Sequence, residues 1–122
     1  MLPSHVIELR EYINSAGVSP FARWREKLDA VTRARVTVAV LRLEAGNFSA
    51  AKGAGRGIFE LRMDFGPGYR VYFGKDGEKL VILLGGGSKG KQQADIEAAQ
   101  ALWQEYKRTK HRRTNNDQDT KP

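Results

Sequence analysis

The sequence predicts an α+β domain, in which an N-terminal strand and a helical hairpin pack on a mainly antiparallel twisted sheet that is followed by a C-terminal helix. The order of patterns along the chain is the first observation: helical periodicity comes early, strand patterning follows, and helical periodicity returns near the end. The second is that the later strands are joined by short glycine-containing turns, which connect antiparallel neighbours. Segregated helices and strands of this kind are typical of α+β domains.

The N-terminal part of the chain predicts an edge strand and a first helix. Apolar and charged residues mix over His5–Ile13, as in a strand with one solvated face. Ser19 followed by Pro20 supplies an N-cap and a first helical residue. The apolar residues of this short helix recur at spacings of three and four, at Phe21, Trp24 and Leu28.

A second helix is expected to run from a cap at Asp29 to about Glu44, where Gly46 ends it. The predicted core-facing stripe of this helix consists of Val31, Ala34, Val38 and Leu41. We expect the two helices to form an antiparallel or angled hairpin whose stripe is core.

After a glycine-rich connection at Lys52–Gly57 the period changes to alternation, which predicts a β-hairpin turning at Gly66–Gly68. One face of its first strand carries Phe59, Leu61, Met63 and Phe65. The continuous apolar run Leu80–Leu84 predicts a central strand that is covered on both sides.

The chain is expected to leave the central strand through a loop at Gly85–Lys91 and to end in a helix. The apolar stripe of that helix consists of Ile96, Ala99, Trp103 and Tyr106. We predict a single domain over residues 1–107 and a basic, polar, disordered tail over 108–122.

The amino-acid composition excludes some classes of protein function and favours others. The 122 residues carry a formal net charge of +7, which favours polyanionic partners or an acidic protein. The chain has no cysteine, and His5 and His111 lie near opposite ends, so a metal enzyme is not expected. Neither a signal peptide nor an apolar run of membrane-spanning length is present, which predicts a cytoplasmic protein with no membrane partner.

Gly85, Gly90 and Lys91 match most of a phosphate-binding P-loop, but the match fails at the next residue. Gln92 stands where a Ser or Thr hydroxyl binds magnesium, and the preceding strands lack helical crossovers. No nucleotide cofactor, and no cofactor of another kind, is therefore expected. The same segment can still hold a phosphate group of RNA, because backbone N–H groups attract anions.

Strand parity predicts a charged constellation on the hairpin. If Met63 pairs with Tyr69, then Arg62 faces Arg70 and Glu60 faces Tyr72 on the side opposite the apolar set. Like charges placed opposite each other weaken a sheet, so the two arginines require an anion. That anion is either a phosphate ligand, or an internal carboxylate from Glu60 and Asp64 on an ordinary solvated face.

Lys89 and Lys91, in the loop after the central strand, are expected to abut this hairpin. With exposed Tyr72 and Tyr69 they would form a basic RNA-binding patch on which bases stack. The alternative is that both lysines belong to a solvated loop.

The residues of the hairpin and of the segments after it resemble a known family. The stretch Phe59–Phe73, the segment Leu83–Lys89 and a helix containing Ile96 and Trp103 look like the RelE/ParE superfamily. They resemble most closely the addiction-module killer proteins related to phage-derived Gp49-like and HigB-type toxins. The resemblance covers about Ser19–Lys107 in the right order.

The resemblance implies a microbial-RNase-like domain that cleaves mRNA at the ribosome and thereby inhibits translation. It also implies a type II toxin–antitoxin pair, in which a cognate antitoxin, often of the helix-turn-helix type, neutralises the toxin. Arg62, Arg70 and Lys89 then match basic catalytic positions of the family. Glu60 stands where the founding toxin has lysine, and Asp95 stands near the place of its C-terminal tyrosine.

On this hypothesis a ribose 2′-OH attacks the adjacent phosphate, and the cations stabilise the charge that develops on the phosphoryl oxygens. Arginine stays protonated and cannot be the base, which leaves Glu60 as the favoured base, or Lys89 if neighbouring cations lower its pKa. A hypothesis of another class is a non-catalytic, ParE-like inhibitor of DNA gyrase, for which the helical hairpin around Trp24 and the C-terminal helix matter more. A phage-derived accessory binding domain without toxicity is the third.

Overall fold

The computed structural model describes residues 7–119, and their side chains from residue 7 to 110. A five-stranded sheet has the order β1-β5-β4-β3-β2, with β1 parallel to β5 and the other neighbours antiparallel. The strands are β1 (Glu8–Glu11), β2 (Ala51–Gly53), β3 (Ile58–Met63), β4 (Tyr69–Lys75) and β5 (Leu80–Ser88). The helices are α1 (Pro20–Glu26), α2 (Ala30–Glu44) and α3 (Gln92–Asp119), with a short 3-10 helix, η1 (Lys89–Lys91), before α3.

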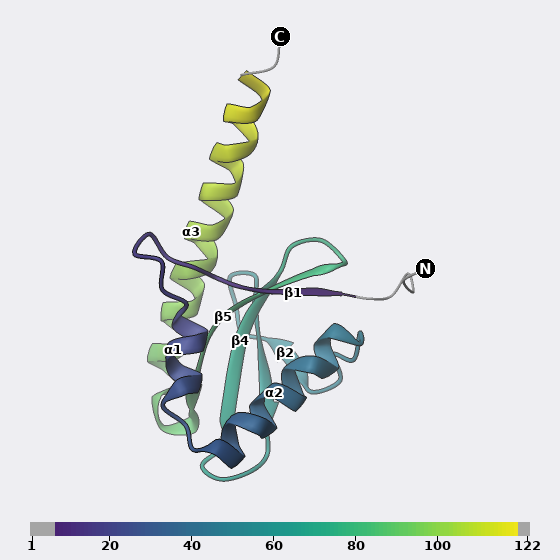
Figure 1. The fold of residues 1–122 in the computed structure, drawn as a ribbon, viewed down its shortest axis with the longest axis vertical. Coiled ribbons are helices and arrows are strands. Elements are labelled where there is room, and N and C mark those ends of the chain that lie inside the picture. The colour runs from purple at the N-terminus through teal and green to yellow at the C-terminus, as the bar shows by residue number, and fades with distance from the viewer. Residues whose placement is uncertain (1–6, 120–122) are drawn as a thin grey trace.

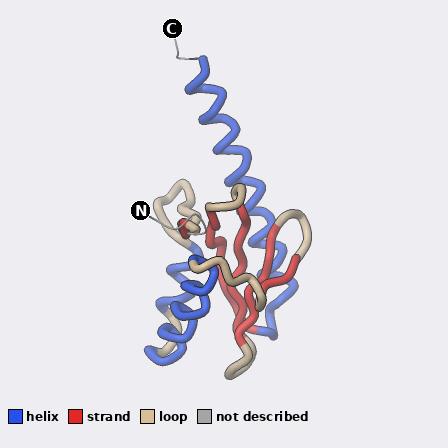
Figure 2. Tube along the Cα trace, turned by 90° about the vertical axis from the view of Figure 1, so that its right-hand side faces the viewer, coloured by secondary structure: helices blue, strands red, loops and turns tan. Residues whose placement is uncertain are grey.

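The sheet lies between two helical layers (Figures 1 and 2). The hairpin of α1 and α2 covers one face, and the first half of α3 covers the other. Each interface has its own apolar cluster; Val36, Leu43, Val71 and Phe73 belong to the first, and Ile58, Leu84, Ala99 and Trp103 belong to the second. The predicted α+β architecture with an edge strand, a helical hairpin, a mainly antiparallel sheet and a C-terminal helix is confirmed.

Local chemistry sets the helix boundaries where the sequence predicts them. Ser19 caps α1, since its Oγ accepts a hydrogen bond from the Ala22 N–H at 3.0 Å. Asp29 caps α2 in the same way through the Thr32 N–H at 2.8 Å. Gly46 follows the end of α2 with φ of 85°, a conformation that glycine adopts without a steric penalty.

The predicted core stripe of α2 is wrong. The side chains that α2 buries are Thr32, Val36, Ala39, Val40 and Leu43. Val31, Val38 and Leu41 instead remain 66%, 52% and 49% exposed. The second half of α2 is apolar on nearly every side, so periodicity alone could not tell which stripe meets the sheet.

Two segments that the sequence predicts to be connections are strands in the structure. Ala51–Gly53 forms β2, a short edge strand paired with β3. Gly85–Ser88 is not a loop but the end of β5, paired with β4 over Tyr69–Tyr72. A Cβ on Gly86 would lie 2.3 Å from a ring carbon of Trp24, so the glycine makes room for the indole of α1.

The predicted stripe of the last helix is confirmed, but its predicted end is not. Ala99 and Trp103 are buried, and Ile96 and Tyr106 pack against them. Disorder was expected from residue 108, whereas α3 continues to Asp119 and projects beyond the sheet (Figure 1). Residues 120–122 of the predicted tail and residues 1–6, with His5, lie outside the described part of the chain.

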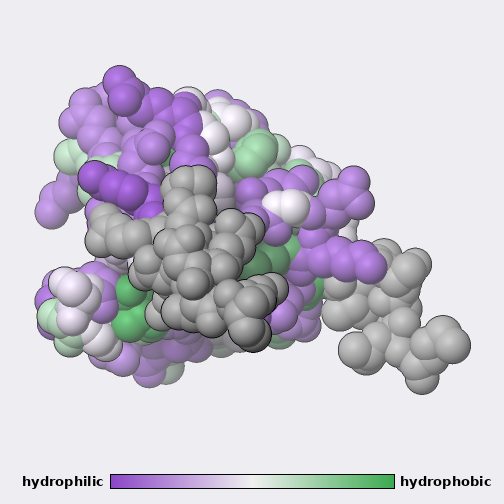
Figure 3. All heavy atoms as spheres, turned by 90° about the horizontal axis from the view of Figure 1, so that it is seen from above, coloured by the Kyte–Doolittle hydropathy of each residue, from purple (hydrophilic) through white to green (hydrophobic). Residues whose placement is uncertain are grey.

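The surface seen along α3 from its C-terminal end is mostly hydrophilic, with small apolar patches (Figure 3). None of the helices over residues 7–119 combines the length and the apolar character needed to cross a membrane.

Candidate functional site

The hairpin of β3 and β4 has the register that parity predicts. Met63 pairs with Tyr69, Arg62 with Arg70, and Glu60 with Tyr72. These last four side chains belong to the sheet face that α3 covers, because they alternate with the residues of the α1–α2 cluster.

Glu60 is the charge centre of the site. Its side chain is 1% exposed, and its carboxylate oxygens lie 3.4 Å from Nε of Arg62 and 3.6 Å from Nε of Arg70. Nζ of Lys52 lies 3.8 Å away, and Nε2 of Gln92 donates a hydrogen bond at 3.2 Å. The two opposed arginines are therefore compensated from inside the protein by Glu60. This differs from the solvated face with Glu60 and Asp64 that one sequence interpretation expected, because Glu60 is buried and Asp64 forms no ion pair among the described residues.

Arg70 is fixed by its surroundings rather than free in solvent. Its side chain is 6% exposed, and Nη1 donates to the carbonyl of Gly68 at 3.3 Å. Its buried Nε has no hydrogen-bond partner among the described residues, and neither has Oε1 of Glu60. The buried Nε faces the Glu60 carboxylate, 3.6 Å from its Oε2, so this pair lies inside the protein.

A hollow of about 690 Å³ opens at this end of the hairpin. The residues that line it are Arg62, Met63, Asp64, Phe65, Gly66, Pro67, Gly68, Tyr69, Arg70 and Lys89. The structure therefore brings together the three cations that the sequence places at the site, Arg62, Arg70 and Lys89. We call this feature the cationic hollow.

The remaining predicted residues lie elsewhere. Tyr72 was expected to be exposed, but it is 0% exposed under α3, and burial raises its pKa to about 12, helped by the charges of Glu60 and Asp95. Tyr69 lies on the opposite face between Trp24 and Phe65, and its half-buried ring borders the hollow. Lys91 is exposed in η1 and lies outside the hollow.

Two carboxylates near the site, those of Asp64 and Asp95, were not predicted as site residues from the sequence. Asp64 lines the cationic hollow and is exposed, and no ion pair within the described residues neutralises it. Asp95 approaches the sheet so closely that a Cβ on Gly87 would lie 1.9 Å from its Oδ2. Desolvation by burial raises the pKa of Asp95. The feature of the sequence that could have indicated the position of Asp95 is Gly87, which pairs with Arg70 in the sheet and leaves room for the carboxylate.

The site brings cations and carboxylates together at one end of the hairpin. In the described part of the chain no three His, Cys, Asp or Glu side chains gather as metal ligands would. What the arrangement can do is hold a phosphate group on Arg62, Arg70 and Lys89 beside the carboxylate of Asp64.

Comparison with known proteins identifies the family of this chain. An uncharacterized protein of Haemophilus influenzae is 45% identical over 86 residues, which are 70% of this chain and 87% of that protein. No solved structure matches. The family model described as phage derived protein Gp49-like (DUF891) matches residues 23–107, which include α2, the whole β2–β5 region and most of the described side chains of α3. The chain belongs to this phage-derived, Gp49-like family.

Proposed function

We propose that this protein is a RelE/ParE-type toxin of a type II toxin–antitoxin system that cleaves mRNA at the ribosome and so inhibits translation. The observation that carries the proposal is the cationic hollow, in which Arg62, Arg70 and Lys89 meet at one end of the β3–β4 hairpin. Membership of the phage-derived Gp49-like family supports it. Its partners are the ribosome, mRNA and a cognate antitoxin, for which a helix-turn-helix protein is our expectation.

The proposed reaction needs no cofactor. The ribose 2′-oxygen forms a bond to the adjacent phosphorus while the bond to the 5′-oxygen breaks, which leaves a 2′,3′-cyclic phosphate and a 5′-hydroxyl. A base takes the 2′-OH proton, and an acid gives a proton to the leaving 5′-oxygen. Arg62 and Arg70 stabilise the negative charge on the phosphoryl oxygens, where fixed cations are most effective.

The structure favours Asp64 over Glu60 as the base. Glu60 is buried behind the wall of the hollow, where it holds Arg62 and Arg70 in place. Asp64 lines the hollow and presents an exposed carboxylate. Lys89, which is exposed at the hollow, is suited to donate the proton to the 5′-oxygen. We therefore assign Glu60 a positioning role and give proton transfer to Asp64 and Lys89.

Inhibition of DNA gyrase by protein binding is the second candidate function. The exposed apolar residues Val31, Val38 and Leu41 on α2 favour it, since a contiguous apolar stripe on a helix is typical of a protein-binding surface. Trp24, which this candidate also invoked, is instead packed over Gly86.

The two candidates differ in what fails first after induction in a bacterial host. Methionine incorporation and plasmid supercoiling are to be followed in the same culture at short intervals. Our proposal expects incorporation to collapse while supercoiling is unchanged. Early relaxation of plasmids with continued incorporation would establish the gyrase candidate instead, and the absence of both effects would leave an accessory binding domain without toxicity.

A further inference from the structure

Gln92, the residue at which the match to a phosphate-binding loop fails, joins two parts of the site. Its backbone N–H donates to the carbonyl of Lys89 and closes η1. Its side-chain Nε2 donates to Oε2 of Glu60 at 3.2 Å, across 32 positions of the sequence. One residue therefore holds both the segment that carries Lys89 and the carboxylate that compensates the arginines.

The Glu60 carboxylate receives this hydrogen bond within a group of cations. Its oxygens lie 3.4 Å from Nε of Arg62, 3.6 Å from Nε of Arg70 and 3.8 Å from Nζ of Lys52. These partners come from β3, β4 and β2, so α3, through Gln92, is the fourth element that meets at one carboxylate. Because the side chain of Glu60 is 1% exposed, bulk water does not replace these partners.

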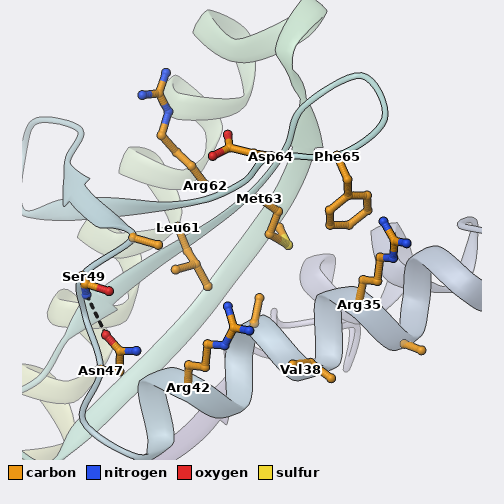
Figure 4. Close-up of a pocket in the computed structure, with 13 residues that line it drawn as sticks. Arg35, Val38, Arg42, Asn47, Ser49, Leu61, Arg62, Met63, Asp64 and Phe65 are labelled. Carbon is orange, nitrogen blue, oxygen red and sulfur yellow. Dashed lines mark hydrogen bonds between the residues drawn. The ribbon is translucent and has the colours of Figure 1, made fainter.

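The side chains of β3 divide between the two faces of the sheet in a way that places Arg62 within this group (Figure 4). Leu61 and Met63 point toward α2, whereas Arg62 leaves the strand on the opposite side. That opposite side is the face which α3 covers, and Gln92 is the first residue of α3. Arg62 and Gln92 therefore approach Glu60 on the same face of the sheet, one from β3 and the other from α3.

Lys89 belongs to the segment that Gln92 anchors. It is the first residue of η1, and its side chain is exposed at the cationic hollow. A Cβ on Gly68 would lie 3.8 Å from Cβ of Lys89 and 4.0 Å from Nη1 of Arg70, so the hairpin turn lies between these two cations. Among the described residues the ammonium of Lys89 has no ion-pair partner, so its position depends on the backbone of η1.

A neutral amide is well suited to this link. A hydrogen bond from an amide N–H to a carboxylate is charge-assisted and stronger than a bond between neutral groups. Gln92 supplies it without a charge of its own, so it cancels none of the positive charge at the hollow. A carboxylate at this position would repel Glu60, and the hydroxyl that a phosphate-binding loop requires there stands on a shorter side chain and reaches less far.

We propose that Gln92 is a positioning residue of the cationic hollow, which holds Lys89 and the two arginines in an arrangement that binds one phosphate group. Through Glu60 it positions Arg62 and Arg70, and through its backbone it positions Lys89. Loss of the side-chain donor therefore uncouples these cations while each of them stays in the chain. That the bound phosphate is the scissile phosphate of mRNA rests on the proposed function, whereas the binding of a phosphate group does not.

The test measures how much Lys89 contributes to RNA binding when Gln92 is changed. The probe is a short, single-stranded, fluorescent 2′-O-methyl RNA, which lacks the free 2′-OH that the proposed cleavage needs and therefore stays intact. Fluorescence anisotropy at low salt gives its affinity for the full chain. In the parent we expect Lys89→Ala to weaken binding about tenfold, because a hydrogen bond between charged groups is lost. In the Gln92→Met background, which keeps the length of the side chain but has no donor, we expect the loss to be less than about twofold.

Two further backgrounds are controls. Gln93→Met changes the next residue of α3, whose amide donates to Glu97 instead of Glu60, and Lys89→Ala is expected to weaken binding about tenfold there. Gln92→Lys restores a donor on a longer side chain, and the effect of Lys89→Ala is expected to return with it. Urea unfolding checks that each protein is folded, and Gln92→Ala takes the place of Gln92→Met if that variant does not fold.

The same loss from Lys89→Ala in the parent and in the Gln92→Met background would overturn the proposal, because Gln92 would then be only a structural partner of Glu60. An absence of RNA binding, or of any effect of Lys89→Ala in the parent, would overturn it as well, since the hollow would then hold no phosphate. The proposed function fails separately. A protein that shows the coupling between Gln92 and Lys89 but leaves mRNA intact in induced cells keeps this positioning role and is not an mRNA-cleaving toxin.

Discussion

Oε2 of Glu60 lies 3.6 Å from Nε of Arg70, and the two side chains are 1% and 6% exposed. A buried ion pair of this kind contributes little net stability, but removing one partner leaves the other charge without compensation. The pair therefore holds the Arg70 guanidinium at the hollow. Removal of either charge alone is expected to destabilise the fold.

Glu60→Gln is expected to lower the free energy of unfolding by about 3 kcal/mol, because the Arg70 charge stays buried without its carboxylate. The double variant Glu60→Leu/Arg70→Met removes both charges and should recover most of that loss. Urea unfolding of the three proteins measures this. A double variant less stable than Glu60→Gln would show that the pair is a source of stability rather than of position.

Asp64→Asn is expected to reduce RNA cleavage about hundredfold or more, because the proposal assigns the role of base to Asp64. The urea midpoint is expected to stay unchanged, because the side chain is exposed. The control is Glu78→Gln, which removes an exposed carboxylate from the β4–β5 turn. Full cleavage by Asp64→Asn would return the role of base to Glu60 or Lys89.

Gly86→Ala is expected to destabilise the protein by about 1–3 kcal/mol, since its Cβ would lie 2.3 Å from the indole of Trp24. Gly85→Ala is the matched control, because no atom lies within 4 Å of its Cβ position. Thermal unfolding should separate the two variants, and the loss in Gly86→Ala should shrink in a Trp24→Leu background. Equal losses at both glycines would point to backbone conformation rather than to the approach of the indole.

Asp76 makes part of the stability dependent on pH. Its pKa is lowered first by a hydrogen bond from Lys110 and then by one from Tyr106, which donates at 2.6 Å. A carboxyl group with a lowered folded-state pKa stabilises the protein above the pKa of the unfolded state, and this contribution is lost as the pH falls through the folded-state value.

Asp76→Asn should therefore flatten the loss of stability in acid. Urea midpoints measured between pH ~2 and ~7 test this. The same acid dependence in Asp76→Asn as in the parent would mean that other carboxyl groups account for it.

Local chemistry made much of the fold predictable. The caps at Ser19 and Asp29 and the register of Arg62 against Arg70 follow from short-range rules, because a capping side chain and a tight turn specify their neighbours. The positions of Arg62 and Arg70 at the site were predictable because the register of the hairpin fixes them.

What the sequence could not predict depends on contacts between distant elements. The burial of Tyr72 follows from the position of α3 over the sheet. Gly86 belongs to a strand paired with β4, and its missing side chain leaves room for the indole of Trp24 in α1. Periodicity gave α2 the wrong buried side, because Val38 and Val36 are equally apolar and only the position of the sheet distinguishes them.

The proposed cleavage of mRNA is tested by a genome-wide map of mRNA 5′ ends after the protein alone is induced in a bacterial host. Arg62→Ala/Lys89→Ala is the inactive comparison, since both side chains are exposed and their loss spares the buried pair, and Lys79→Ala is the matched control. We expect new 5′-hydroxyl ends at in-frame codon positions with the parent and with Lys79→Ala, and none with the double variant. Growth arrest with intact mRNA would contradict the proposed cleavage of mRNA.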